Sequence, residues 1–75
     1  MNNGGFNNVI LTDRQVYHIL FLSKVKGLQP YQIEEQFPVS RATIRQIVNG
    51  KSRKDCYFAF IDYMEQHPRK VKNLF

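Results

Sequence analysis

The chain has 75 residues, a formal net charge of +5 and a single cysteine. This length allows one small domain with a modest core, and a lone cysteine excludes a disulfide framework and fits a reducing compartment. The N-terminal stretch MNNGGFNNV has neither positive charge nor a long apolar run, and the longest apolar run, residues 19–22, is far too short to cross a bilayer. We therefore expect a soluble cytoplasmic protein with no signal peptide and no membrane partner.

The N-terminal part of the chain predicts an arm followed by a helix. Residues 1–10 are rich in Asn and Gly and are expected to form a flexible arm. The helix begins at Thr12, which can form a capping box with Gln15, and ends at Gly27. Its core-facing side chains recur at the spacing of an amphipathic helix: Val16, Ile19 and Leu20.

Two further short helices are predicted, joined by a tight turn. The first begins at Pro30, because a missing N–H does no harm at the start of a helix. Ile33 and Phe37 are four residues apart, so they are expected to share one face of it. The proline after Phe37 ends this helix. Ser40 then caps the next helix, and Gly50 suits the left-handed position that follows it.

The helix that begins at Ser40 has two contrasting faces. Its inward side is apolar: Val39, Ile44, Ile47 and Val48. Its outward side carries groups that read base edges in DNA, since arginine pairs with guanine, glutamine or asparagine pairs with adenine, and a small apolar group contacts the thymine methyl. The predicted base-reading residues are Ser40, Arg41, Ala42, Arg45, Gln46 and Asn49.

Positive charge is concentrated in the second half of the chain. Residues 1–40 have three basic and three acidic side chains, whereas residues 41–75 have eight basic and three acidic ones, which accounts for the net charge of +5. A basic half indicates a polyanionic partner, and the absence of acids from residues 41–54 avoids repulsion of phosphate. The predicted phosphate contacts are Thr43, Lys51, Ser52, Arg53 and Lys54.

The pattern I-x-x-x-F-x-V-S-R-x-T-I-x-x-I-x-x-G-K in residues 33–51 resembles the helix-turn-helix of phage repressors and of resolvase or invertase DNA-binding domains. The resemblance covers about residues 28–52, and its most specific part is V-S-R-x-T-I-x-x-I. The chain departs from the family pattern at Pro38, where glycine is usual, and at Glu34, where a small residue is usual. The resemblance implies that double-stranded DNA is the partner and that bases are contacted by Ser40, Arg41, Ala42, Arg45 and Gln46.

The last predicted helix spans about residues 56–67, with Asp55 as its cap and Pro68 at its end. It carries more large apolar groups than one helical stripe can bury in so small a domain. Because exposed aromatic surface indicates an interface, we expect a homodimer through this helix; the alternative is that the helix only closes the core. The predicted interface residues are Tyr57, Phe58, Phe60, Ile61, Tyr63 and Met64.

The remaining polar residues predict no catalytic or metal site. Glu34 and Glu35 point about 100° apart on a helix and are expected on a solvated face. One cysteine and two distant histidines do not form a zinc set, and no nucleophile triad or glycine-rich phosphate loop is evident. We expect neither enzyme activity nor a cofactor. The basic tail, residues 69–75, has three alternatives: it contacts phosphate, folds against a partner subunit, or stays loose.

Together these patterns predict a small all-α domain of four or five helices over residues 11–68, containing a helix-turn-helix. The predicted function is that of a transcriptional regulator of phage or bacterial type. It binds specific double-stranded DNA, with the helix at about residues 40–49 in the major groove, as a dimer. The alternative is a protein–protein interaction module, an adaptor or inhibitor of another regulator, whose partner binds the aromatic C-terminal helix. Nothing in the sequence decides between repressor and activator.

Overall fold

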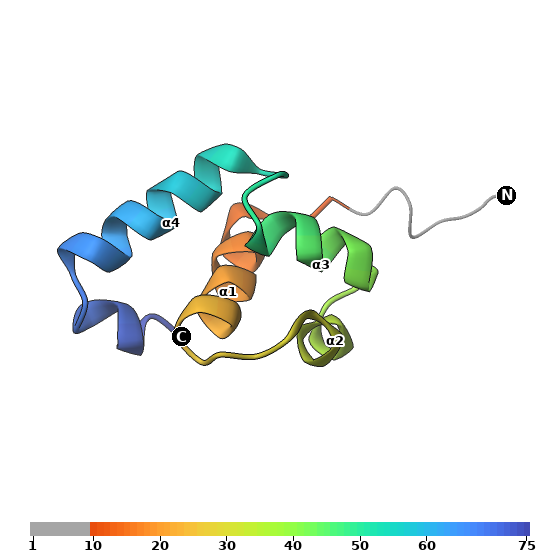
Figure 1. Ribbon diagram of the computed structural model, residues 1–75, viewed down its shortest axis with the longest axis horizontal. Helices are drawn as coiled ribbons and strands as arrows, with labels where there is room; N and C mark the ends of the chain where they lie inside the picture. Colours follow the sequence, from red (N-terminus) through yellow and green to blue (C-terminus); the bar gives the residue numbers. More distant parts are fainter. Residues whose placement is uncertain (1–9) are drawn as a thin grey trace, which may run out of the picture.

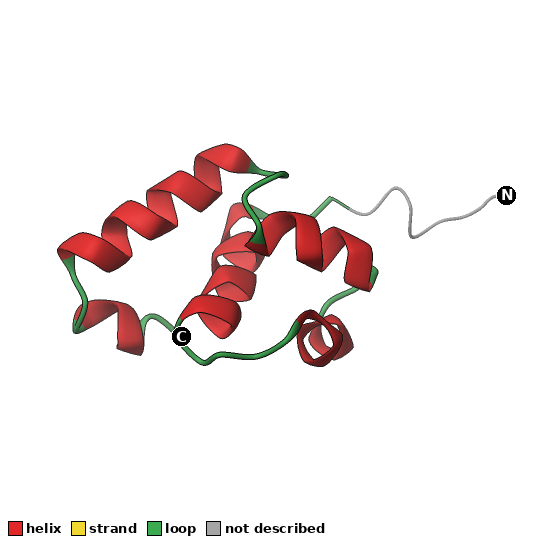
Figure 2. Ribbon diagram, in the orientation of Figure 1, coloured by secondary structure: helices red, strands yellow, loops and turns green. Residues whose placement is uncertain are grey.

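The computed structural model describes residues 10–75, so the predicted arm at residues 1–10 lies almost wholly outside the described range. Every regular element within that range is helical, which confirms the predicted small all-α domain (Figure 1, Figure 2). In chain order the elements are α1 (Asp13–Lys24), α2 (Pro30–Ile33), the 3-10 helix η2 (Glu34–Gln36), α3 (Arg41–Val48), α4 (Lys54–Gln66) and the 3-10 helix η3 (Lys70–Asn73). None of the helices in residues 10–75 has the length and apolarity needed to cross a membrane.

α1 begins where the sequence predicts but ends at Lys24, three residues before the predicted end at Gly27. The Thr12 backbone N–H donates to Gln15 Oε1 at 2.8 Å, and the Gln15 backbone N–H donates to Thr12 Oγ1 at 3.1 Å, which completes the capping box. Gly27 follows the helix with a φ of +73°, a left-handed conformation that favours glycine. The Leu28 backbone N–H then donates to the Leu22 carbonyl at 2.9 Å, which closes the turn after α1.

The core is assembled around α1, which packs against both α3 and α4 (Figure 1). Val16, Ile19 and Leu20 are fully buried, which confirms the predicted stripe, and Phe21 and Leu22 are buried as well. The other buried residues of the described chain are Leu11, Ile33, Ile44, Ile47, Val48, Cys56, Phe60 and Val71. Burying one large apolar side chain contributes about 1.5–3 kcal/mol, so this cluster is the main source of stability.

The α-helix before α3 is shorter than the sequence predicts. α2 has a single turn, and η2 follows it directly. Phe37 has extended backbone angles, φ −134° and ψ 150°, so the prediction that Ile33 and Phe37 share a helical face is wrong. Pro38 explains this geometry, because its ring excludes the α conformation from the residue before it. Phe37 is nevertheless half-buried, with its ring centroid 5.4 Å from that of His18.

α4 begins directly after a residue with unusual backbone geometry. Its N-cap is Arg53 and its first residue is Lys54, so Asp55 lies in the first turn and is not the cap that the sequence predicts. Arg53 has a φ of +53°, the left-handed conformation that non-glycine residues adopt rarely. The contacts of its guanidinium with the start of α1 offset the cost of this conformation. The guanidinium donates to the Leu11 carbonyl at 2.7 Å and forms an ion pair with Asp13.

The C-terminal tail folds back onto its own chain. Val71 in η3 is only 2% exposed, and the Phe75 ring stacks on His18 with 4.5 Å between ring centroids. The Phe75 ring also lies 5.4 Å from that of Phe21 in α1. The tail therefore belongs to the folded domain, and the predicted domain boundary at residue 68 is wrong because η3 supplies part of the core.

Candidate nucleic-acid interface

α3 forms as the sequence predicts, with a cap at each end. The Thr43 backbone N–H donates to Ser40 Oγ at 3.4 Å, which confirms Ser40 as the N-cap. Gly50 follows the helix with a φ of +74°. A side chain at Gly50 would also meet the ring of Tyr57, since a Cβ built there lies 3.0 Å from Tyr57 Cε2. The end of α3 is therefore tied to the start of α4.

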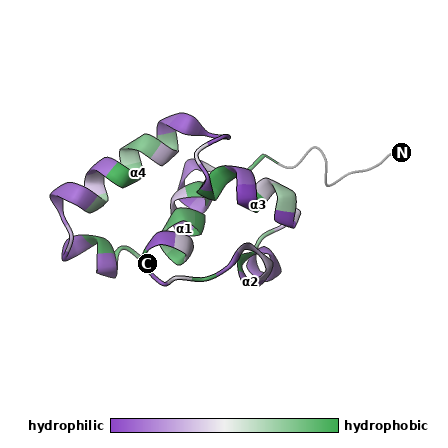
Figure 3. Ribbon diagram, in the orientation of Figure 1, coloured by the Kyte–Doolittle hydropathy of each residue, from purple (hydrophilic) through white to green (hydrophobic). Residues whose placement is uncertain are grey.

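The two faces of α3 separate as predicted. Ile44, Ile47 and Val48 are buried against the core, and Val39 is half-buried. Hydrophilic and hydrophobic segments alternate along the helix (Figure 3). All six residues predicted to read bases are exposed: Ser40, Arg41, Ala42, Arg45, Gln46 and Asn49. Thr43, predicted to contact phosphate, is half-buried, and its Oγ1 lies 3.4 Å from Ser40 Oγ.

Most of these exposed polar groups remain available. Among residues 10–75, no ion pair or side-chain hydrogen bond engages Arg45, Gln46 or Asn49. They can therefore donate to, or accept from, a ligand placed along the outer face of α3. Arginine and the two amides have the forked geometry that matches base edges.

Arg41 differs from the other three, because it has partners inside the domain. Its Nε donates to Glu34 Oε1 at 2.9 Å, and its Nη2 lies 2.8 Å from the same oxygen. Its Cζ lies 6.0 Å from the centroid of the exposed Tyr31 ring. Sequence reasoning placed Glu34 on a merely solvated face and overlooked Tyr31. The sequence signal for this pair was an acid, Glu34, seven residues before an arginine.

A hollow of about 510 Å³ borders α3 beside the end of α1 and the start of α2. Lys24, Arg45 and Asn49 are among the residues that line it. Lys24 is exposed, and its Nζ also lies 5.7 Å from the centroid of the Tyr57 ring. Lys24 is thus a cation next to the outer face of α3 that sequence reasoning did not include. The helical periodicity of the sequence places Lys24 in the last turn of α1 but does not indicate that it lies near α3.

The loop after α3 contains both free and engaged cations. Lys51 and Lys54 are exposed, and Ser52 is half-buried. Arg53 is committed to Leu11 and Asp13, so its prediction as a phosphate contact does not fit its position. The physical reason is that Arg53 holds the junction between α3 and α4 against the start of α1. Lys51, Ser52 and Lys54, the first residue of α4, therefore stay predicted phosphate contacts.

The thiol and phenol next to this junction are held neutral. Burial raises the pKa of the Cys56 thiol above its ordinary value of 9.0, and its hydrogen bond to Asp13 at 3.5 Å acts in the same direction. Burial also raises the pKa of Tyr17 above 10.0, assisted by the neighbouring Cys56. A thiol whose pKa is raised has little thiolate character near neutral pH. Within residues 10–75 no three His, Cys, Asp or Glu side chains cluster as metal ligands, so we assign no metal site there.

The aromatic helix α4 uses most of its apolar surface inside its own chain. Phe60 is only 2% exposed, so its prediction as a dimer-interface residue is wrong: it belongs to the core. Four more of the predicted interface residues are half-buried and pack against that core: Tyr57, Ile61, Tyr63 and Met64. Phe58 alone of the six is fully outside, at 64% exposure.

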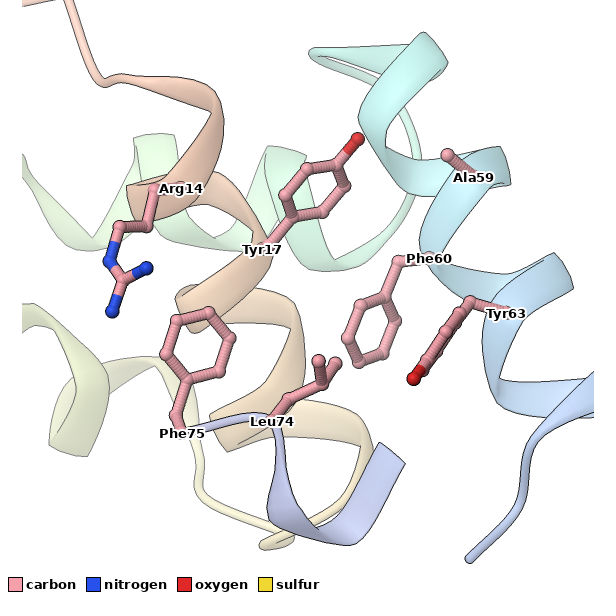
Figure 4. Close-up of a pocket in the computed structure, with 7 residues that line it drawn as sticks. All are labelled: Arg14, Tyr17, Ala59, Phe60, Tyr63, Leu74 and Phe75. Atoms are coloured by element: carbon pink, nitrogen blue, oxygen red, sulfur yellow. The ribbon is translucent and has the colours of Figure 1, made fainter. Parts of the chain in front are cut away.

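The tail and α4 line a common pocket. Leu74 and Phe75 lie opposite Phe60 and Tyr63 across an open pocket between α4 and α1 (Figure 4). The pocket has a volume of about 550 Å³, and Arg14 stands at its edge, with its Cζ 5.4 Å from the Phe75 ring centroid. Within residues 10–75 the ring contacts of Phe75 are with His18 and Phe21 of α1, so the tail packs mainly on α1 and shares this pocket with α4.

Comparisons of the chain with models of protein families, with curated proteins and with solved structures found no match. An inference about function therefore depends on the geometry of the chain itself. The surface chosen as the candidate site is the outer face of α3, because it brings together exposed arginine and amide side chains, with lysines at both sides.

Proposed function

We propose that the protein binds specific sequences in double-stranded DNA and regulates transcription, with α3 in the major groove. The observation that carries the proposal is the exposure of all six predicted base-reading residues on one face of a helix whose opposite face is buried. A major groove about 12 Å wide admits an α-helix, and each good bidentate contact contributes about 1–3 kcal/mol of discrimination. Arg45, Gln46 and Asn49 have no competing partner in the described chain.

The surroundings of α3 support this orientation. Lys51 and Lys54 follow its C-terminal end in the sequence, and Lys24 lines the same hollow as Arg45. Cations at these positions bind the phosphates on either side of a groove and set the register of the helix without reading sequence. α2, the turn at residues 37–40 and α3 follow one another in the order of a helix-turn-helix, with α1 packed behind them.

We further propose that the protein is of bacterial or phage origin, that it acts in the cytoplasm, and that it binds DNA as a homodimer. A two-fold dimer reads two half-sites about 34 Å apart, which is one turn of DNA. The only fully exposed member of the predicted dimer interface is Phe58, so a dimer through α4 must be centred on it. Sedimentation of the wild-type protein and of Phe58→Glu, with and without DNA, tests this part, and a wild-type monomer at high micromolar concentration would remove it.

The experiment that tests DNA recognition is selection from random duplexes by the purified protein, followed by sequencing of the bound pool. An enriched inverted repeat supports the dimeric regulator, and a single enriched half-site supports recognition by a monomer. Arg45→Ala is expected to weaken binding to the selected site by about 1–3 kcal/mol. Arg69→Ala is the matched control, because it removes the same charge from an exposed position near η3. An equal effect of the two variants would argue against base reading by α3.

One observation favours a second candidate, a protein–protein interaction module. Within residues 10–75, Phe58 exposes 64% of its surface on α4. If α4 binds a protein partner, Phe58→Ala abolishes that binding and Arg45→Ala leaves it unchanged. If selection from random duplexes enriches no sequence, this candidate replaces DNA recognition.

A further inference from the structure

The guanidinium of Arg41 is held on two sides by residues that precede the turn. Glu34 Oε1 accepts from Nε at 2.9 Å and lies 2.8 Å from Nη2, which fixes one edge of the group. The Tyr31 ring, with its centroid 6.0 Å from Cζ, lies toward one face of it. Both residues belong to the α2–η2 segment, whereas Arg41 is the first residue of α3. The side chain is thus oriented before any ligand arrives.

The part of Arg41 that Glu34 leaves free is the part that can read a base. A guanidinium has five N–H donors, and a single carboxylate oxygen occupies one on Nε and one on Nη2. Both donors of Nη1 and the second donor of Nη2 remain, at the end of the fork. Two parallel donors at this end match O6 and N7 of guanine. The Arg41 side chain is 54% exposed and lies in the first turn of α3, where recognition helices contact base edges.

This arrangement favours specificity over general affinity. A flexible arginine loses conformational freedom when it binds, and a side chain that is already oriented loses less. The carboxylate also repels phosphate, which weakens binding to all DNA to a similar degree. Glu35, the neighbouring acid in η2, would repel phosphate equally, but within residues 10–75 it forms no ion pair.

We propose that Glu34 is a positioning residue that directs Arg41 to a guanine and so makes the protein select G·C at the base pair facing the start of α3. This inference rests on the DNA-binding function proposed above.

The test measures base preference in the wild type, Glu34→Ala, Glu35→Ala and Arg41→Ala. Dissociation constants are compared between the selected duplex and duplexes changed at one base pair at a time. We expect Arg41→Ala and Glu34→Ala to lose preference for guanine at the same single base pair, by about tenfold. Glu35→Ala should retain that preference while binding all duplexes slightly more tightly. In the Arg41→Ala background, removal of Glu34 should cause no further loss of preference.

Two results would overturn the inference while leaving the proposed function standing. One is that Glu34→Ala retains the guanine preference and behaves like Glu35→Ala, which would make Glu34 a surface charge only. The other is that Arg41→Ala changes no single-base preference although the wild type has one. A wild type without any base preference would instead overturn the proposed function and this inference together. Circular dichroism establishes that each variant is folded, which is expected because an exposed ion pair contributes little to stability.

Discussion

The guanidinium of Arg53 donates to the backbone carbonyl of Leu11 at 2.7 Å, across 42 positions of sequence. The same group pairs with Asp13, so one side chain joins the start of α1 to the start of α4. Arg53 also has a φ of +53°, which its side-chain bonds hold in place. The junction after α3 is therefore set by a residue that the sequence marked only as a loop cation.

Arg53→Ala is expected to lower the free energy of unfolding by about 1–3 kcal/mol, because it removes charge-assisted hydrogen bonds and keeps the unfavourable φ. Arg53→Gly loses the same bonds but relieves the backbone by about 1 kcal/mol, so it should be the more stable of the two. Urea denaturation measures both values. Wild-type stability in Arg53→Ala would mean that the contacts to Leu11 and Asp13 contribute nothing.

Gly50→Ala and Gly27→Ala form a matched pair. Both glycines have nearly the same φ, +74° and +73°, so both variants carry the same backbone cost of about 1 kcal/mol. A Cβ at position 50 lies 3.0 Å from the Tyr57 ring, whereas no atom of residues 10–75 lies within 4 Å of a Cβ at position 27. Gly50→Ala should therefore be the less stable variant by thermal denaturation. Equal melting temperatures would show that the Tyr57 ring moves aside freely.

Phe60→Ala and Phe58→Ala separate the inner and outer sides of α4. Phe60 is 2% exposed, and its truncation should cost about 3–5 kcal/mol. In a small domain this is a large part of the total stability. Phe58 is 64% exposed, so Phe58→Ala should change stability by less than about 0.5 kcal/mol. The two unfolding curves decide whether α4 closes the core through Phe60, and a stable Phe60→Ala would contradict that assignment.

Lys51→Ala tests the loop after α3 as a phosphate contact. If Lys51 binds one phosphate, the variant should weaken binding to all duplexes alike and reduce the slope of log K against log salt by about 0.9. Its base preferences should not change. Lys70→Ala, in η3 and also exposed, serves as the control and should leave the slope unchanged. A change in base preference with Lys51→Ala would mean that it reads sequence.

The raised pKa values of Cys56 and Tyr17 predict how stability depends on pH. In the unfolded chain the thiol loses its proton near pH 9.0, whereas in the folded chain it keeps the proton to higher pH. The unfolded state therefore binds fewer protons above pH 9, and stability falls as pH rises through that range. Tyr17 adds to the fall above pH 10. Cys56→Ala should have a smaller loss of stability between pH 7 and 9.5 than the wild type, measured by denaturant midpoints. An identical loss would exclude Cys56 as its source.

The sequence by itself determined the features that depend on contacts within one helical turn. Thr12 and Gln15 are three residues apart, as are Ser40 and Thr43, so the caps of α1 and α3 follow from local hydrogen bonding. The inward and outward faces of α3 follow from helical periodicity in the same way. These local rules located all six exposed candidates for base reading.

Only the tertiary structure decided what covers α4 and where the charged side chains of the loops go. Phe60 is buried because it joins one core cluster with residues of α1 and with Val71 of the tail, which lies more than ten residues further along the chain. Arg53 binds Leu11 rather than a ligand because folding brings residue 11 beside residue 53. Arg41 meets Glu34 because the turn at Pro38 folds one helix across the other. Helical periodicity states which residues share a face, but the partner of that face depends on contacts between distant segments.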